Sequence, residues 1–223
     1  MRLFLTTAAV CLLAGPAAAA DDGWSGAATL ATQYVSKGAG KSDGDPHASL
    51  TLEHGLFAGY AGVWAGNVST SQGADAEVHL YAGAKRDIAG INLDGRAMHK
   101  SLPGTRDGVQ DQFWEFRADA SRPFGKTKAR LRIEYAPDSY AATRQAWWVE
   151  GQLSRNISQK WNASAGVGRR EQAKGSDYTA WNAGVRYALT KAAGLDVRWY
   201  DTDSHELGRN NEGRLVAALS LGF

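Results

Sequence analysis

Apolar and polar residues alternate along the segment that ends the printed chain, from Gly213 to Phe223. The apolar positions fall on every second residue and are Leu215, Ala217, Leu219, Leu221 and Phe223. A period of two indicates a β-strand with one face in apolar surroundings and the other in polar or crowded surroundings. A chain built on such segments must pair its strands into a sheet whose two faces meet different environments.

The segment 128–135 has the same period and a charged face. Its apolar side chains belong to Ala129, Leu131, Ile133 and Tyr135, and its charged side chains belong to Lys128, Arg130, Arg132 and Glu134. Four charges on one face of a strand require water or ionic partners. The charged face is therefore expected to line a wet interior, and the apolar face to point away from it.

Alternation along the rest of the chain predicts about twelve strands. They are expected at 24–37, 48–53, 55–69, 76–85, 91–100, 114–121, 128–135, 147–154, 161–170, 178–188, 195–200 and 213–223. The patterns of 48–53, 55–69 and 91–100 are the weakest, so ten or fourteen strands also fit the sequence. Short links alternate with longer ones, which is typical of a barrel with turns at one rim and loops at the other. The short links lie near Asp87, Pro123, Asn156 and Lys191, and the longer ones near Ser42, Arg106, Ser139, Gly175 and Glu206.

The first twenty residues have the composition of an export signal. Arg2 carries their one charge, an apolar stretch runs from Leu3 to Leu13, and small residues stand at Ala18 and Ala20. We expect a signal peptide over residues 1–20 that is cleaved after Ala20, followed by one barrel domain over residues 21–223. Cys11 lies within the signal, so the mature chain would hold no thiol for a disulfide or a cysteine metal site.

The composition of residues 21–223 narrows the class of protein further. Removing Arg2 leaves 24 Lys and Arg against 23 Asp and Glu, a net charge of +1, so no nucleic acid partner is expected. No apolar run of about 18 residues follows the signal, which argues against a transmembrane helix. In lipid the chain must then close into a barrel, which satisfies every backbone group internally. All 8 Trp and all 8 Tyr lie in this part and would supply aromatic girdles at the two interfaces.

The predicted fold class is therefore all-β: an antiparallel transmembrane β-barrel of the outer-membrane type with about 12 strands, in contact with outer-membrane lipid and lipopolysaccharide. The competing fold is a soluble lipocalin-like barrel, which buries its apolar face inside and fills it with large side chains. Here the apolar face is mostly Ala, Val, Leu and Gly, and the opposite face is charged on nearly every strand. This distribution of charge favours the membrane barrel.

Motifs for chemistry are weak in this sequence. Gly40-Lys41-Ser42 lacks the first glycine of a P-loop, because position 35 is valine. The five His, at 47, 54, 79, 99 and 205, do not have the spacing of a zinc site. We therefore expect no cofactor, no metal and no enzymatic activity. A lipid hydrolase assembled from separate strands stays open as a minor alternative, although no GxSxG motif supports it.

Function is expected in the lumen. The predicted pore-lining residues are Lys85, Arg96, Arg117, Lys128, Arg130, Arg132, Glu134, Arg170, Arg186, Arg198 and Arg214. Two interpretations are open: the charges pair into a lattice that plugs a narrow barrel, or an excess of basic residues favours anions. On the predicted strand 128–135, the positive charge of Lys128, Arg130 and Arg132 is larger than the one negative charge of Glu134. The sequence therefore favours a passive pore for small hydrophilic solutes with a weak anion preference. A closed structural or adhesive barrel with functional outer loops is the alternative.

Four segments, taken in order, are similar to one family of bacterial outer-membrane barrels. They are Ser42–Pro46, Gly55–Trp64, Glu77–Gly83 and Trp199–Asp203. Their order resembles the TorF family of porins over essentially the whole mature chain. The sequence departs from that family at His99–Leu102, where a Tyr-rich stretch would precede the Pro-Gly loop. The resemblance implies passive diffusion across a Gram-negative outer membrane and no reaction. Phe223 likewise resembles the terminal signal that the barrel-assembly machinery binds.

Overall fold

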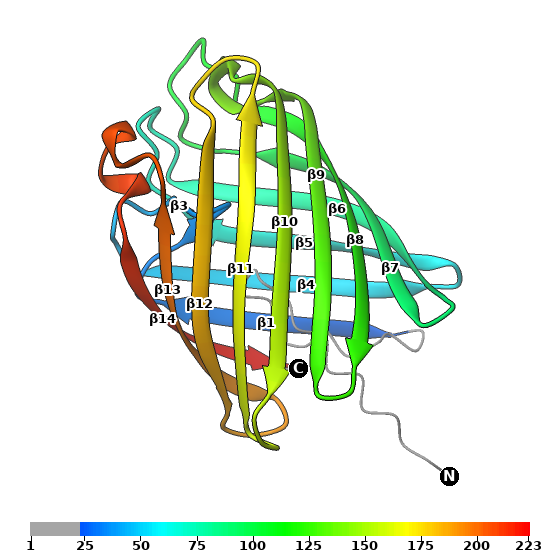
Figure 1. The fold of residues 1–223 in the computed structure, drawn as a ribbon. Helices are drawn as coiled ribbons and strands as arrows, with labels where there is room; N and C mark the ends of the chain where they lie inside the picture. The colour runs from blue at the N-terminus through cyan, green and yellow to red at the C-terminus, as the bar shows by residue number, and fades with distance from the viewer. Residues whose placement is uncertain (1–22) are drawn as a thin grey trace.

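The computed structural model describes residues 23–223, which form a closed barrel of twelve antiparallel strands (Figure 1). The barrel strands are β1 (Trp24–Ala31), β4 (His47–Leu56), β5 (Gly59–Asn67), β6 (Ala76–Ile88), β7 (Ile91–Ser101), β8 (Gln112–Phe124), β9 (Thr127–Ser139), β10 (Arg144–Asn156), β11 (Trp161–Gln172), β12 (Tyr178–Ala188), β13 (Ala193–Thr202) and β14 (Arg214–Gly222). β1 pairs with both β4 and β14, and the second pairing closes the barrel. The predicted all-β fold with twelve strands is confirmed.

The two rims of the barrel differ in the length of their connections. Turns of two to four residues join β4 to β5, β6 to β7, β8 to β9, β10 to β11 and β12 to β13 at one rim. The longer loops lie at the opposite rim and carry the short 3-10 helices η1 (Tyr140–Ala142), η2 (His205–Leu207) and η3 (Arg209–Asn211) (Figure 1). The alternation of short and long links in the sequence therefore corresponds to the two rims.

Two boundaries differ from the sequence-based expectation. The boundary expected between the strands 48–53 and 55–69, at His54 and Gly55, is wrong, because β4 continues to Leu56 and β5 begins at Gly59. The first predicted strand, 24–37, is also wrong beyond Ala31, where β1 ends. The chain then leaves the wall, and a separate hairpin of β2 (Val35–Ser36) and β3 (Ala39–Gly40) forms. The predicted signal peptide, residues 1–20, lies outside the described residues.

The outer face of the barrel is apolar and carries aromatic residues near both rims. Near the long-loop rim the exposed tryptophans are Trp114, Trp147, Trp181 and Trp199, and near the short-turn rim they are Trp24 and Trp161. Aliphatic side chains such as Leu80, Leu131 and Leu219 are exposed between them. Such a band, flanked by two aromatic girdles, is the surface that a membrane-spanning barrel presents to lipid. No helix in the described residues is long and apolar enough to span a membrane.

The hairpin β2–β3 lies inside the barrel and contacts strands on opposite sides of it. Val35 packs with Ala31 and with Val216 of β14. Ala39 packs instead with Trp148 of β10 and Tyr178 of β12. Lys37 and Gly38, at the tip, both have positive φ angles, of 53° and 82°, as the tight two-residue turn of a hairpin requires. The segment 32–46 therefore crosses the lumen and narrows it.

Replacing Ile133 with Arg tests which surroundings the outer face meets. Ile133 points outward from the middle of β9. Arg at the mid-plane of a bilayer destabilises a barrel by about 2–4 kcal/mol, whereas near the interfaces the cost falls to about 0–1 kcal/mol. We therefore expect Ile133→Arg to lower the free energy of unfolding, measured by urea titration in lipid vesicles, by about 2–4 kcal/mol.

Ile91→Arg is the matched control, because Ile91 begins β7 beside a short turn at the rim and is similarly exposed. We expect Ile91→Arg to lower the free energy of unfolding by only about 0–1 kcal/mol. An equal decrease for Ile91→Arg and Ile133→Arg would contradict the placement of the bilayer mid-plane at the centre of the outer face.

Candidate functional site

All eleven predicted pore-lining residues lie at inward positions of their strands. Each alternates with the exposed apolar residues of the outer face, so the parity of the sequence pattern is preserved around the barrel. They do not form one uniform ring. Arg117, Arg130, Arg132 and Glu134 form ion pairs with residues of neighbouring strands, and Lys85, Arg96 and Arg198 lie within 4 Å of a carboxylate elsewhere in the wall or in their own strand. The four others lie toward the rims.

The centre of the lumen holds an ionic network built around the hairpin tip. Lys37 Nζ forms an ion pair with Glu134 at 2.9 Å and another with Glu115. Arg117 Nε donates to Glu134 at 2.6 Å, and Lys100 Nζ lies 2.8 Å from Glu115. These five side chains are almost fully buried. We call Lys37, Lys100, Glu115, Arg117 and Glu134 the central network, and it joins the hairpin to β7, β8 and β9.

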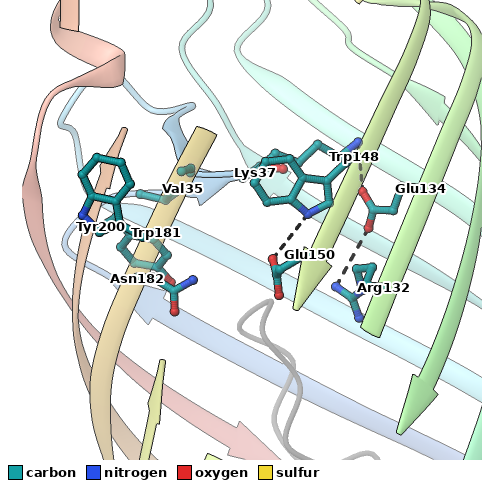
Figure 2. A pocket seen from close by; sticks show the side chains of 12 residues that line it. Val35, Lys37, Arg132, Glu134, Trp148, Glu150, Trp181, Asn182 and Tyr200 are labelled. Atoms are coloured by element: carbon teal, nitrogen blue, oxygen red, sulfur yellow. Dashed lines mark hydrogen bonds and ion pairs between the residues drawn. The ribbon is translucent and has the colours of Figure 1, made fainter. Parts of the chain in front are cut away.

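The charged face of β9 is compensated by the strands on either side of it. Arg132 donates two hydrogen bonds to Asp119 of β8, at 2.8 and 3.0 Å. Arg130 pairs with Glu150 of β10, which also accepts a hydrogen bond from Trp148 at 3.3 Å. Figure 2 shows Arg132, Glu134, Trp148 and Glu150 grouped beside Lys37. The excess of positive charge expected on this strand therefore does not persist at Arg130 and Arg132, because their acids come from other strands.

Two more of the predicted residues lie beside Glu53, on the far side of the network from the long loops. Arg96 donates to the hydroxyl of Tyr60 at 3.1 Å, stacks over Tyr81 and approaches Glu53 to 3.9 Å. Lys85 lies 3.7 Å from Glu53 and over the ring of Tyr60. These contacts fix both cations to the wall of β4, β5 and β6.

The remaining predicted residues have varied surroundings. Arg198 binds Asp196, Asn182 and Ser164 at 2.7 to 3.2 Å. Arg214 donates to Gln33 and to backbone carbonyls near η3, at the long-loop rim. In the described part of the chain, no carboxylate lies within 4 Å of the three others, which are Lys128, Arg170 and Arg186.

The predicted list of pore-lining residues omits four inward charges, Lys37, Lys41, Glu53 and Lys100. Glu53 and Lys100 follow the parity of their strands and could have been found by extending the alternation. Lys37 and Lys41 belong to the inner hairpin and the residue after it. The local signal for them is Lys37-Gly38 between two short β-prone pairs, a sequence that a hairpin turn accepts.

The hairpin separates two cavities. The larger, of about 380 Å³, lies at the long-loop rim and is bounded by the hairpin, β7, β8, β11 and the loops. We call it the vestibule. The smaller, of about 50 Å³, lies on the other side of Ser36 and Lys37 and is lined by residues such as Arg132, Glu150 and Asn182 (Figure 2). The hairpin tip is therefore the constriction between them.

The arrangement gives little support to hydrolytic or metal chemistry. Within residues 23–223, no His hydrogen-bonds a Ser or Thr hydroxyl, as a nucleophile and its base would. His79 instead contacts Glu77 at 2.6 Å, and His205 contacts Asp201 at 2.7 Å in the outer loops, which raises the pKa of the His205 imidazole. The same residues contain no group of three or more potential metal ligands.

Solved structures with the same architecture are outer-membrane channels. The KdgM porin superposes with a TM-score of 0.61 at 10% identity, covering 89% of this chain and 99% of that one. The NanC porin gives 0.58 at 9% identity, covering 90% and 99%. The COG4313 outer membrane channel from Pseudomonas putida F1 gives 0.57 at 11% identity, covering 89% and 94%. At these identities the likeness shows the fold, which is a closed antiparallel barrel of the outer-membrane porin class.

The family itself is identified by sequence. Residues 16–218 match the model of the family described as "Bacterial protein of unknown function (Gcw_chp)", and the chain belongs to that family. A search of curated protein sequences gave no match.

Replacing Glu134 with Gln tests whether the central network stabilises the barrel. The change leaves Lys37, Arg117 and Arg132 facing a neutral amide in a buried site. Removing one partner of a buried ion pair costs about 3–5 kcal/mol. We expect the free energy of unfolding in urea to fall by about that amount.

Asp138→Asn is the control, since Asp138 and Arg144 form a pair at 3.7 Å with both side chains about half exposed. Exposed pairs contribute about 0–1 kcal/mol. A Glu134→Gln effect no larger than that of Asp138→Asn would show that the network is solvated and does not stabilise the fold.

Proposed function

We propose that this chain is a porin-like channel of the bacterial outer membrane through which small hydrophilic solutes diffuse passively. One observation carries the proposal: the outer face of the barrel is apolar, whereas the lumen is lined with charged side chains and leads into the vestibule at the long-loop rim. A lumen rich in ionised groups offers a passing solute replacements for its hydration shell. The fold shared with porins supports the same conclusion.

We attribute the ionic preference of the channel to the vestibule. Its lining contains four cations, Lys37, Lys41, Lys100 and Arg170, against the carboxylates of Glu77 and Glu115. An excess of positive charge at an entrance attracts anions and repels cations. The weak anion preference proposed here therefore depends on the vestibule more than on the compensated arginines of β9.

The finer attributes of the channel are part of the same proposal. They are a signal peptide cleaved after Ala20, recognition of Phe223 by the barrel-assembly machinery, a Gram-negative outer membrane and kinship with the TorF family of porins. Support comes from the export-like composition of residues 1–20 and from the quoted sequence segments. The porin fold supports the coarser part of the proposal, a porin-like barrel of the outer membrane.

The inner hairpin is the observation that favours the alternative, a closed structural or adhesive barrel. It reduces the lumen beside Lys37 to a cavity of about 50 Å³.

Single-channel recording distinguishes the open channel from the closed barrel. With the protein from bacterial outer membranes in a planar bilayer, we expect discrete conductance steps and, under a salt gradient, a reversal potential of the sign for anions. An inserted barrel that never conducts would refute the channel.

Gly38→Ala tests whether the hairpin sets the conductance. Gly38 has a φ of +82°, and a Cβ there would overlap the Cβ of Ala180 on β12. The added methyl group must push the hairpin away from β12. We expect a different unit conductance from that of the unmodified protein, and an increase if the tip leaves the constriction.

The matched control is Gly108→Ala. Gly108 lies in the loop between β7 and β8 and has nearly the same φ, +80°, but nothing lies within 4 Å of its added Cβ. Both variants carry the same backbone strain of about 1–2 kcal/mol, so only the overlap distinguishes them. Identical conductances in the two variants would exclude the hairpin as the limiting element.

A further inference from the structure

The vestibule has the volume of a binding site. Its volume of about 380 Å³ falls within the range of small-molecule pockets, which is about 300–1,000 Å³. Its walls come from the inner hairpin, from β6, β7, β8, β9, β11 and β12, and from the five long loops that follow β5, β7, β9, β11 and β13. Its floor is the hairpin tip, above the constriction. A solute entering from the loop rim must therefore occupy this cavity before it passes Lys37.

Two of the four vestibule cations are already committed to acids. Lys37 pairs with Glu115 and Glu134, and Lys100 pairs with Glu115 at 2.8 Å. Glu77 is held by His79 at 2.6 Å and approached by Lys100 to 3.8 Å. Both carboxylates of the lining are therefore engaged at short distance by cations or by His79.

The other two cations, Lys41 and Arg170, have no such partner. Among residues 23–223, no carboxylate lies within 4 Å of Lys41 Nζ or of the Arg170 guanidinium. Glu77 attracts Lys41 from beyond 4 Å, whereas Arg170, Lys37 and Lys100 repel it, so three cations lie within electrostatic reach of Lys41 against one acid. Two positive charges facing one cavity repel, and an anion between them would relieve that repulsion.

The positions of these two cations are fixed by the backbone. Lys41 N donates to Tyr34 O at 2.8 Å, and Lys41 O accepts from Ser69 N at 2.7 Å. Arg170 lies in β11 between the register partners Trp148 and Tyr178. Both cations are therefore held on ordered elements before any ligand arrives, which lowers the entropy cost of binding.

Neutral polar groups complete the lining. The hydroxyls of Thr70 and Tyr140 lie 3.0 Å apart in the lining, and Asn210 and Gln172 add amides. Hydroxyl and amide groups both donate and accept hydrogen bonds, so this lining favours a ligand that carries hydroxyl groups.

We infer that the vestibule is a binding site for small hydroxylated carboxylates, with Lys41 and Arg170 holding the carboxylate and the polar lining hydrogen-bonding the hydroxyls. The inference rests on the proposed channel function, because it identifies a class of solute that the channel would select at its entrance. Guanidinium and ammonium groups form charge-assisted hydrogen bonds with carboxylates, which are stronger than neutral ones.

Calorimetric titration with gluconate and with sorbitol tests the site. The two compounds have the same six-carbon hydroxylated chain and differ in the carboxylate. With the protein purified from outer membranes in detergent at low salt, we expect gluconate to bind measurably and sorbitol to bind more weakly. Arg170→Gln and Lys41→Gln should each weaken gluconate binding about tenfold or more, as expected for the loss of one charge-assisted hydrogen bond.

Arg169→Gln is the matched control. Arg169 is adjacent in the sequence but lies on the outer face of β11, where it contacts Thr179 at 3.2 Å and Asp177 at 3.8 Å. This variant should bind gluconate as the unmodified protein does. Equal binding of gluconate and sorbitol, or gluconate binding unchanged in both Arg170→Gln and Lys41→Gln, would overturn the inference.

The same samples separate this inference from the proposed function. A protein that conducts ions but does not prefer gluconate remains a channel and lacks the carboxylate site. A protein that binds gluconate with the expected dependence on Lys41 and Arg170 but never conducts retains the site and loses the channel. Because Lys41 and Arg170 lie on different elements, a folding defect in one variant leaves the other to decide.

Discussion

The backbone pairing between β1 and β14 is the constraint on which the rest of the structure depends. It joins Ala27–Ala31 to 218–222, and reciprocal hydrogen bonds of 2.8 and 3.0 Å between Gly26 and Phe223 extend it by one residue pair. Without this pairing two strand edges would expose a row of unsatisfied backbone groups, which lipid does not tolerate. Closure thus allows every strand to present apolar side chains outward and charged ones inward.

Closure also decides how the inward charges are satisfied. Once the wall is a cylinder, acids and bases from neighbouring strands face each other at fixed register, as Arg132 does with Asp119 and Glu150. Most of the lumen charge is therefore neutralised locally at short distances. The inner hairpin joins the same scheme through Lys37. Within residues 23–223, the inward cations without a carboxylate within 4 Å lie toward the two ends of the lumen. Lys41 and Arg170 face the vestibule, and Lys128 and Arg186 lie toward the short-turn rim.

The wall of the barrel could be predicted from the sequence, because a period of two is a strong signal wherever one face of a strand is polar. The strand predicted at 178–188, for example, has the same bounds as β12. Two features could not be predicted from the sequence. The ion pair between Arg130 and Glu150 depends on the register in which β9 pairs with β10, and a period of two does not specify that register. The alternation of β1 continues in the sequence through Tyr34, so the pattern alone does not show that the wall strand ends at Ala31 and that a separate hairpin follows.

The hairpin is attached to the wall at both of its ends, yet none of the barrel's ladder hydrogen bonds depends on it. The circumference of the barrel and the width of its passage are consequently encoded in different stretches of sequence. Changes confined to 32–46 can alter the bore while twelve strands keep their register. The segment 32–46 is therefore the part of the chain in which the proposed passage can change in width without a change in the wall.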